Sequence, residues 1–270
     1  MIDNTGKTAV IFGVRNDSSI AWQVAKKLFA SGCRVAVSYV SDTETEVKGL
    51  LAANGMDAGL AMCVDVRDEQ QIAGFVTAVH ARCGKIDYIL HGVAYGNHKV
   101  MCSAMPGSKD EPPRYIDIPF DDLADSFNIS AYSLLRICRV AEPFLAPAAS
   151  ILTLTYNASQ RLFPGYAGMA INKAALENMM MGLAGYFGKS GVRINAVSAG
   201  LVMTTSAGGI KGVRQLRKIG KYTAPLGNIT AEDVADAALY YFSGLSQRVT
   251  GNIHYVDGGF NIMGVTDRGE

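Results

Sequence analysis

The sequence predicts an α/β fold, in which one domain is built on a doubly wound parallel sheet of about seven strands with helices on both faces. Short runs rich in β-branched residues alternate along the chain with segments of helical periodicity, which is typical of right-handed βαβ units. Hydrophobic residues make up 49% of the 270 residues and charged residues 18%, which indicates a globular chain with a large core. No repeat, low-complexity tract or linker divides the chain, so we expect residues 1–270 to form a single domain.

The individual elements follow from local patterns. Short apolar runs bounded by glycine, aspartate or a helical segment predict strands at residues 8–13, 34–39, 59–66, 86–92, 150–155, 193–200 and 252–259. Between them, apolar residues recur every three or four positions, which predicts helices at residues 19–32, 43–55, 68–84, 120–145, 166–187 and 230–242. Gly32 closes the first helix, and Thr230 with Asp233 has the spacing of a capping box at the start of the last.

One long segment breaks this alternation. Residues 96–119 contain four of the chain's eight prolines and show no periodicity, so we expect a long loop there. The loop follows the fourth expected strand, and ligands of such sheets bind at the carboxyl ends of the strands. We therefore expect residues 96–119 to lie beside the ligand.

Composition and charge exclude several classes of function. A net charge of +1 and a pI of about 7.6 give no reason to expect nucleic acid or an anionic membrane as a partner. No apolar run approaches the roughly 20 residues of a membrane span, and the N-terminus lacks a signal-peptide pattern, so we expect a cytoplasmic protein. The five cysteines and four histidines are widely scattered, so we expect reduced cysteines and no metal site.

The loop after the first strand, GVRNDSSIAWQ, raises the question of a nucleotide. The glycine-rich G-x-G-x-x-G pattern is absent, since only Gly13 of it is present. A helix that begins at Ser18 or Ser19 nevertheless directs free N–H groups and the positive end of its dipole at any nearby phosphate. An ordinary βα turn with serine as N-cap explains the same residues equally well.

Two further strand ends bear on the choice of nucleotide. The segment SYVSD, which ends the second strand, lacks the basic residues that grip a 2′-phosphate, and Asp42 comes late for a ribose contact. This favours NADH over NADPH, although Arg15 leaves NADPH open. Asp65 and Val66 after the third strand are placed to meet an adenine edge, or else Asp65 caps the next helix.

Two tyrosines and a lysine suggest a reaction site. Tyr166 and Lys173 are seven residues apart, about two helical turns or ~10.5 Å, so both lie along one edge of the expected helix. A lysine there can hold ribose hydroxyls and lower the pKa of a nearby phenol. Tyr156 leaves the fifth strand and can reach the same cavity, but a packed amphipathic helix would also explain a Tyr/Lys pair.

The same residues carry a resemblance to a known family. Ala170 stands where ordinary short-chain dehydrogenases have the lysine of Tyr-x3-Lys, whereas Tyr-x9-Tyr-x6-Lys resembles the divergent enoyl-acyl-carrier-protein reductases. The resemblance spans about residues 5–262 and is carried also by the segments GVRNDSSIA, HGVAYG, NISAYS, GVRINAVSAGLVMTTSAGGIKG and HYVDGGF. It implies a Rossmann-type domain that uses NADH to reduce the trans-2 double bond of an enoyl thioester on acyl carrier protein, in fatty acid elongation or a related pathway.

The resemblance also implies residue roles and partners. Tyr166 would hydrogen-bond the thioester oxygen, Lys173 would bind the nicotinamide ribose, and Tyr156 would line the acyl site and assist proton delivery. Residues implied to contact the dinucleotide are Gly13, Ser19, Ile20, Asp65, Val66, Val93, Lys173, Val202, Met203 and Thr204. Residues implied to face the substrate are Gly96, Tyr156, Tyr166 and Met169. A homotetramer and a mobile substrate lid at about residues 200–222 are implied as well.

A basic segment supports an acidic carrier protein independently. No acidic residue stands between Glu177 and Glu232, and the basic residues there are Lys189, Arg193, Lys211, Arg214, Arg217, Lys218 and Lys221. Such a surface would steer an acidic partner, although a solvated basic helix has the same composition.

Several departures from the family pattern leave alternatives open. Gln23 stands at a usual glycine, Ala94 adds a methyl group beside the expected nicotinamide pocket, and Leu201 and Met203 replace a common Pro and Arg. These changes and the long loop are compatible with a specialised isoform as well as a housekeeping enzyme. A reductase of specialised metabolism acting on another enoyl or carbonyl compound is the alternative function. A non-catalytic nucleotide-binding regulator is disfavoured because both tyrosines and Lys173 are present.

Overall fold

The computed structural model describes residues 2–101, 114–163, 165–204 and 213–264. In these residues seven strands form one parallel sheet in the order β3-β2-β1-β4-β5-β6-β7. The strands are β1 (Thr8–Phe12), β2 (Arg34–Tyr39), β3 (Ala61–Cys63), β4 (Ile86–His91), β5 (Leu145–Thr155), β6 (Arg193–Ala199) and β7 (Ile253–Val256). The predicted doubly wound α/β fold is therefore confirmed, and its strand order reverses between β1 and β4.

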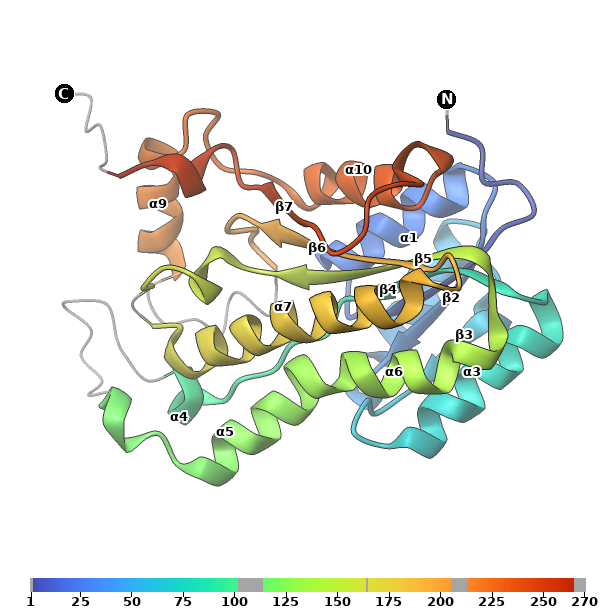
Figure 1. Cartoon of the computed structure of the whole chain (residues 1–270), viewed down its shortest axis with the longest axis horizontal. Helices are drawn as coiled ribbons and strands as arrows, with labels where there is room; N and C mark the ends of the chain where they lie inside the picture. Colours follow the sequence, from blue (N-terminus) through green and yellow to red (C-terminus); the bar gives the residue numbers. More distant parts are fainter. Residues whose placement is uncertain (1, 102–113, 164, 205–212, 265–270) are drawn as a thin grey trace.

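Helices cover both faces of the sheet (Figure 1). Against one face lie α3 (Glu69–Cys83), α6 (Ser133–Ala141) and α7 (Ala167–Gly188), whose buried side chains share a core with residues of β1, β4, β5 and β6. Against the other lie α1 (Ile20–Ala30), α2 (Glu44–Ala53) and α10 (Ala231–Tyr241). The remaining α-helices of the described residues are α4 (His98–Met101), α5 (Phe120–Phe127) and α9 (Val213–Thr223).

The expected caps are present where the sequence signals were specific. Thr230 Oγ1 accepts a hydrogen bond from the N–H of Asp233, and Asp233 Oδ2 accepts one from the N–H of Thr230, which completes the capping box of α10. Gly32, with φ of 89°, follows α1 in a conformation that favours glycine.

The prediction of one helix at residues 120–145 is wrong in two respects. This segment consists of α5 and α6 joined by a π-helical turn at Asn128–Tyr132, a feature that hydrophobic periodicity does not reveal. The chain then enters β5 at Leu145 rather than at residue 150, and a register shift separates the pairs that Ile86 and Tyr88 make with β5.

Other boundaries also differ from expectation, and the strand expected at residues 252–259 is only Ile253–Val256. The strand expected at residues 59–66 is only Ala61–Cys63, because Asp57 accepts a hydrogen bond from the N–H of Gly59 and holds residues 58–60 in a 3-10 turn. Within the loop expected at 96–119, residues 98–101 form the short helix α4, and residues 102–113 lie outside the described part of the chain.

Candidate active site

A cavity of about 790 Å³ opens at the carboxyl ends of strands β1 to β6. Its position at the reversal of strand order is where ligands of such sheets bind. Most residues that the sequence assigned to the site line this cavity: Gly13, Ser19, Ile20, Asp65, Val66, Val93, Gly96, Tyr156, Tyr166, Met169, Lys173, Val202 and Thr204. Met203 does not line it, although its neighbours on both sides do, so the geometry gives its assignment no support.

The segment between β1 and α1 is shaped by close backbone contact. Gly13 has φ of 98°, and a Cβ atom there would lie 2.3 Å from the carbonyl oxygen of Gly92, so only glycine fits. Ser19 Oγ accepts hydrogen bonds from the N–H groups of Arg15 (3.2 Å) and Asn16 (3.0 Å), which curls the loop over the start of α1.

Gln23, which stands in α1 where the family has a glycine, anchors the loop before the helix. Its side chain is buried, and its Nε2 donates to the carbonyl oxygen of Asp17 at 2.7 Å. Trp22 Nε1 donates to Asp17 Oδ1 at 3.1 Å. Two side chains of α1 thus hold Asp17 in the loop. At the N-terminus of the helix, Ser19 and Ile20 line the cavity.

The rim beyond β2 carries an ion pair. Arg15 Nη2 lies 2.9 Å from Asp42 Oδ2, and both residues line the cavity. The sequence left Arg15 free to bind a 2′-phosphate, but here its charge is paired with a carboxylate that would repel such a group.

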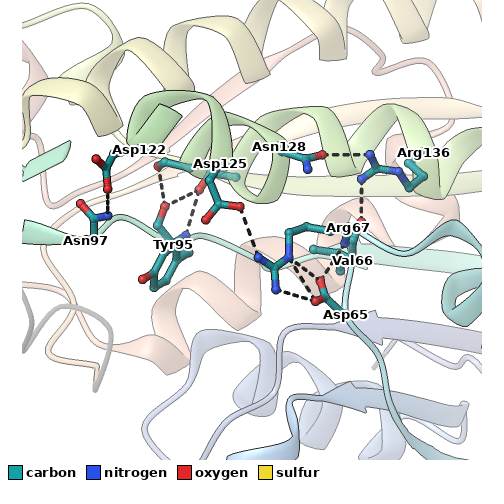
Figure 2. A network of polar contacts seen from close by, with 11 residues as sticks. Asp65, Val66, Arg67, Tyr95, Asn97, Asp122, Asp125, Asn128 and Arg136 are labelled. Carbon is teal, nitrogen blue, oxygen red and sulfur yellow. Dashed lines mark hydrogen bonds and ion pairs between the residues drawn. The ribbon is translucent and has the colours of Figure 1, made fainter. Parts of the chain in front are cut away.

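Asp65, in the segment after β3, lines the cavity and is paired with Arg67 (Figure 2). The Arg67 side chain donates to both Asp65 oxygens, with Nη2 at 2.7 Å from Oδ2 and Nε at 3.1 Å from Oδ1, and this lowers the pKa of the Asp65 carboxyl group. Asp65 does not cap the next helix. Asp68 does so, because its Oδ1 accepts hydrogen bonds from the N–H groups of Gln70 and Gln71.

The two tyrosines and the lysine meet at the opposite end of the cavity. Tyr156 follows β5 and Tyr166 is the N-cap residue of α7, with ring centroids 5.1 Å apart in an edge-to-face arrangement. Lys173 is 4% exposed, and its Nζ donates to the carbonyl oxygen of Leu154 at 2.8 Å. Side chains from a strand end and a helix start therefore share one wall.

Burial governs the ionisation of these groups. Desolvation raises the pKa of the Tyr166 phenol well above its ordinary value. The pKa of the Tyr156 phenol is also raised, mainly by desolvation and to a smaller extent by the nearby Tyr166. Lys173 is not among the groups that shift the pKa of either phenol here, so the expectation that it lowers the pKa of a nearby phenol stays a prediction. Desolvation also lowers the pKa of Lys173 to about 8, against an opposing contribution from Glu177.

The segment after β4 forms the wall beside Tyr166. A Cβ atom on Gly96 would lie 2.9 Å from Cγ and Sδ of Met169, so the thioether packs directly on this glycine. Ser126 Oγ donates to the carbonyl oxygen of Tyr95 at 2.6 Å, and Ser130 Oγ accepts from the N–H of Tyr95 at 2.9 Å. Residues of α5 and the π turn thus hold the backbone that leads to Gly96.

Sequence reasoning missed several residues of the site. Arg67, Asp125 and Ile129 line the cavity, and Arg67 Nη1 lies 3.3 Å from Asp125 Oδ1. For Arg67, the sequence signal was the Asp-x-Arg spacing at residues 65–67. The contact with Asp125 joins segments 58 residues apart, so no local pattern reveals it.

Other expectations concern charge and the substrate lid. Arg193 does not belong to a basic surface, because it is buried in β6 and donates to the carbonyl oxygens of Ser246 and Tyr241. Lys211 and residues 205–212 of the expected lid lie outside the described part of the chain. Residues 213–222 of that lid belong to α9.

The described ranges contain neither a metal-binding cluster nor a membrane-spanning helix. No group of three or more histidine, cysteine, aspartate or glutamate side chains there could hold a metal ion. Among the same residues, no helix is long and apolar enough to span a membrane.

Comparisons with known proteins agree on one family. The model of the enoyl-(acyl carrier protein) reductase family matches residues 13–261. The enoyl-acyl-carrier-protein reductase (NADH) FabI of Rickettsia typhi is 37% identical over 261 residues, which cover 96% of this chain and 95% of the relative. Enoyl-acyl-carrier-protein reductase (NADH) 1 of Rhizobium meliloti is 37% identical over 263 residues, covering 96% of this chain and 92% of the relative. The solved enoyl-acyl-carrier-protein reductase of Anaplasma phagocytophilum in complex with NAD has a TM-score of 0.87 at 33% identity, covering 98% of this chain and 95% of that one.

Proposed function

Because the chain belongs to the enoyl-(acyl carrier protein) reductase family, we propose that it reduces the trans-2 double bond of an enoyl thioester on acyl carrier protein with NADH, in fatty acid elongation or a related pathway. The observation that carries this proposal is the convergence of Tyr156, Tyr166 and Lys173 on one wall of the large cavity.

The cavity suits a dinucleotide. Its volume of about 790 Å³ lies within the roughly 300–1,000 Å³ typical of ligand pockets. Gly13 lets the loop after β1 pack directly against the backbone of Gly92, and the N-terminus of α1, which lines the cavity through Ser19 and Ile20, favours negative charge there. The Asp42 carboxylate, paired with Arg15, supports NADH rather than NADPH.

Bound NADH supplies the hydride that adds to the β-carbon of the enoyl group. Negative charge then develops on the thioester oxygen, and a hydrogen-bond donor placed there lowers the barrier. Tyr166 is suited to this role because burial keeps its phenol protonated and able to donate. Tyr156 packs against that ring and lines the acyl site, where it assists proton delivery.

Lys173 acts on the dinucleotide rather than on the phenol. In its protonated form the Nζ group has three donors, of which one is used by the carbonyl oxygen of Leu154. The others can hold ribose hydroxyls, and this contact fixes the nicotinamide beside Tyr166.

Acyl carrier protein is supported as the partner by the charge of α9. Exposed basic side chains on that helix are Arg214, Arg217, Lys218 and Lys221, and its residues 213–223 include no carboxylate. A basic surface attracts an acidic protein and accelerates its docking.

Assembly and location complete the proposal. Ile171, Met181 and Tyr186 expose large apolar surface on α7, which supports a homotetramer built on this face. We place the protein in the cytoplasm. Light scattering of the purified chain tests the tetramer, and a monomeric mass at micromolar concentration would contradict it.

The activity is tested by following NADH absorbance with crotonyl thioester and, separately, with a 3-oxoacyl thioester. We expect oxidation with the enoyl compound only. Oxidation with the 3-oxoacyl compound alone would instead favour the alternative, a reductase of specialised metabolism, and no oxidation with either would support a non-catalytic regulator.

The role of Tyr166 has a matched control on the same helix. Tyr166→Phe keeps the ring that packs on Tyr156 but removes the donor, so kcat should fall about 10²–10³-fold while NADH binding is retained. Tyr186→Phe changes an exposed phenol and should leave kcat unchanged. Loss of NADH binding in the Tyr166 variant would mean that its role is different.

A further inference from the structure

A buried arginine lies behind the adenine side of the cavity. Arg136 on α6 is 9% exposed and does not line the cavity itself. Burying a guanidinium group is unfavourable unless its N–H groups find acceptors. Its partners therefore indicate what the charge is used for.

Each end of the guanidinium group has an acceptor (Figure 2). Nη1 donates to the carbonyl oxygen of Val66 at 2.7 Å, and Nη2 donates to Asn128 Oδ1 in the π turn at 2.9 Å. The group also lies 5.0 Å from the centre of the Tyr132 ring, a favourable cation–π distance. Arg136 thereby ties the segment after β3 to the π turn.

The carbonyl that Arg136 holds belongs to a peptide unit facing Asp65. The same planar unit carries the N–H of Arg67, which donates to Asp65 Oδ1 at 2.9 Å. Fixing the Val66 oxygen therefore also fixes the direction of the Arg67 N–H and, through it, the Asp65 carboxylate. The N–H of Asp65 in turn donates to Gln71 Oε1 at 2.8 Å, so the segment is held from both sides.

We propose that Arg136 is a positioning residue for the adenine half of the dinucleotide, acting through the Val66–Arg67 peptide to orient Asp65 and Val66 at the cavity wall. This inference rests on the proposed function, since it assumes that the ligand is NADH with its adenine beside these two residues. The nicotinamide end lies at Tyr166 and Lys173 and does not depend on Arg136.

A second buried arginine provides a matched control. Arg193 in β6 is 6% exposed and donates to the carbonyl oxygens of Ser246 and Tyr241, which do not line the cavity. Replacing it removes a comparable buried charge and more hydrogen bonds than Arg136 makes. A purely structural role for Arg136 predicts that the two replacements behave alike.

The experiment measures dissociation constants for NADH, ADP-ribose and reduced nicotinamide mononucleotide in wild type, Arg136→Met and Arg193→Met. Arg136→Met should weaken ADP-ribose and NADH binding roughly tenfold, the effect of about one lost hydrogen bond. Binding of the mononucleotide, which lacks adenine, should stay within about twofold of wild type. Arg193→Met should change none of the three affinities, and KM for NADH should rise only in the Arg136 variant, with kcat unchanged.

Two further variants keep the test decisive. Arg136→Lys retains the charge but cannot bridge Val66 and Asn128, and Asn128→Ala removes one anchor of the guanidinium group. Both variants should bind NADH and ADP-ribose more weakly than wild type, with a smaller loss than Arg136→Met and unchanged binding of the mononucleotide. If the methionine variant does not fold, these two variants test the proposal in its place.

The outcomes separate the two proposals. A wild-type protein that binds neither NADH nor ADP-ribose would overturn the proposed function. A wild type that binds both, with normal ADP-ribose affinity in all Arg136 and Asn128 variants or an equal loss for the mononucleotide, would overturn only the role of Arg136.

Discussion

The burial of Lys173 predicts that this residue, to which we assign a role in cofactor binding, destabilises the protein without cofactor. Lys173 is 4% exposed, and its Nζ donates to the Leu154 carbonyl oxygen. Desolvation lowers its pKa from 10.5 to about 8, even though Glu177 acts in the opposite direction. Lys173→Met keeps a similar shape and removes the charge.

The sign and size of the effect follow from proton linkage. Between about pH 8 and 10.5 the unfolded chain holds a proton on this lysine that the folded chain has lost, so stability rises with pH in this window. Below about pH 8 the full penalty applies, and at ~1.36 kcal/mol per pKa unit it amounts to about 3 kcal/mol. Loss of the hydrogen bond to Leu154 offsets about 1 kcal/mol, so the methionine variant should be about 2 kcal/mol more stable at pH 7.

Urea unfolding of wild type and Lys173→Met, from about pH 6 to about pH 10.5, measures this difference. The advantage of the variant should shrink steadily above about pH 8, while its affinity for NADH falls at least about tenfold at pH 7. Lys189→Met, at the exposed end of α7, is the control and should show no such pH dependence. A Lys173 variant that is no more stable than wild type at pH 7, with a difference independent of pH, would refute the reasoning.

Three further predictions concern the rim, the packing and the sheet. Asp42→Asn frees the Arg15 guanidinium and removes the repelling carboxylate, so the ratio of kcat/KM for NADPH to that for NADH should rise roughly tenfold in steady-state assays. Gly168→Ala brings a Cβ atom to 2.6 Å from Val100 Cγ1 and 2.8 Å from its carbonyl oxygen, so the free energy of unfolding should fall by about 1–3 kcal/mol in urea. Burial lowers the pKa of His91 to about 3, so the unfolded chain takes up a proton below about pH 6.5 that the folded chain does not, and the urea midpoint should be lower at about pH 5 than at about pH 7.5.

The fold was largely predictable because its signals are local. Each strand of a parallel sheet is an apolar run, and each crossover helix carries its own periodicity. The errors lie where non-local contacts decide. The π turn at 128–132 is supported by the N–H of Tyr95, which donates to Ser130 Oγ from 35 residues away, and no short window of sequence contains both residues.

The candidate site was predictable in the placement of its residues but not in its electrostatics. Spacing located Tyr166 and Lys173 on one wall, because helix geometry follows from counting residues. It could not reveal that burial dominates both side chains and raises the pKa of the phenol. Desolvation depends on every segment packed around a group, so it is a property of the assembled fold.

The two buried cations of the site differ in a way that suits the two ends of NADH. Arginine keeps its proton under burial and offers a fixed fork, so Arg136 can hold the peptide beside Asp65 without entering the cavity. Lysine is a compact charge whose pKa responds to burial, and Lys173 lines the cavity, where ribose hydroxyls can satisfy its remaining donors. With the residue roles that we propose, the adenine end would be organised before the ligand arrives, whereas the nicotinamide end would gain stability when the ligand binds.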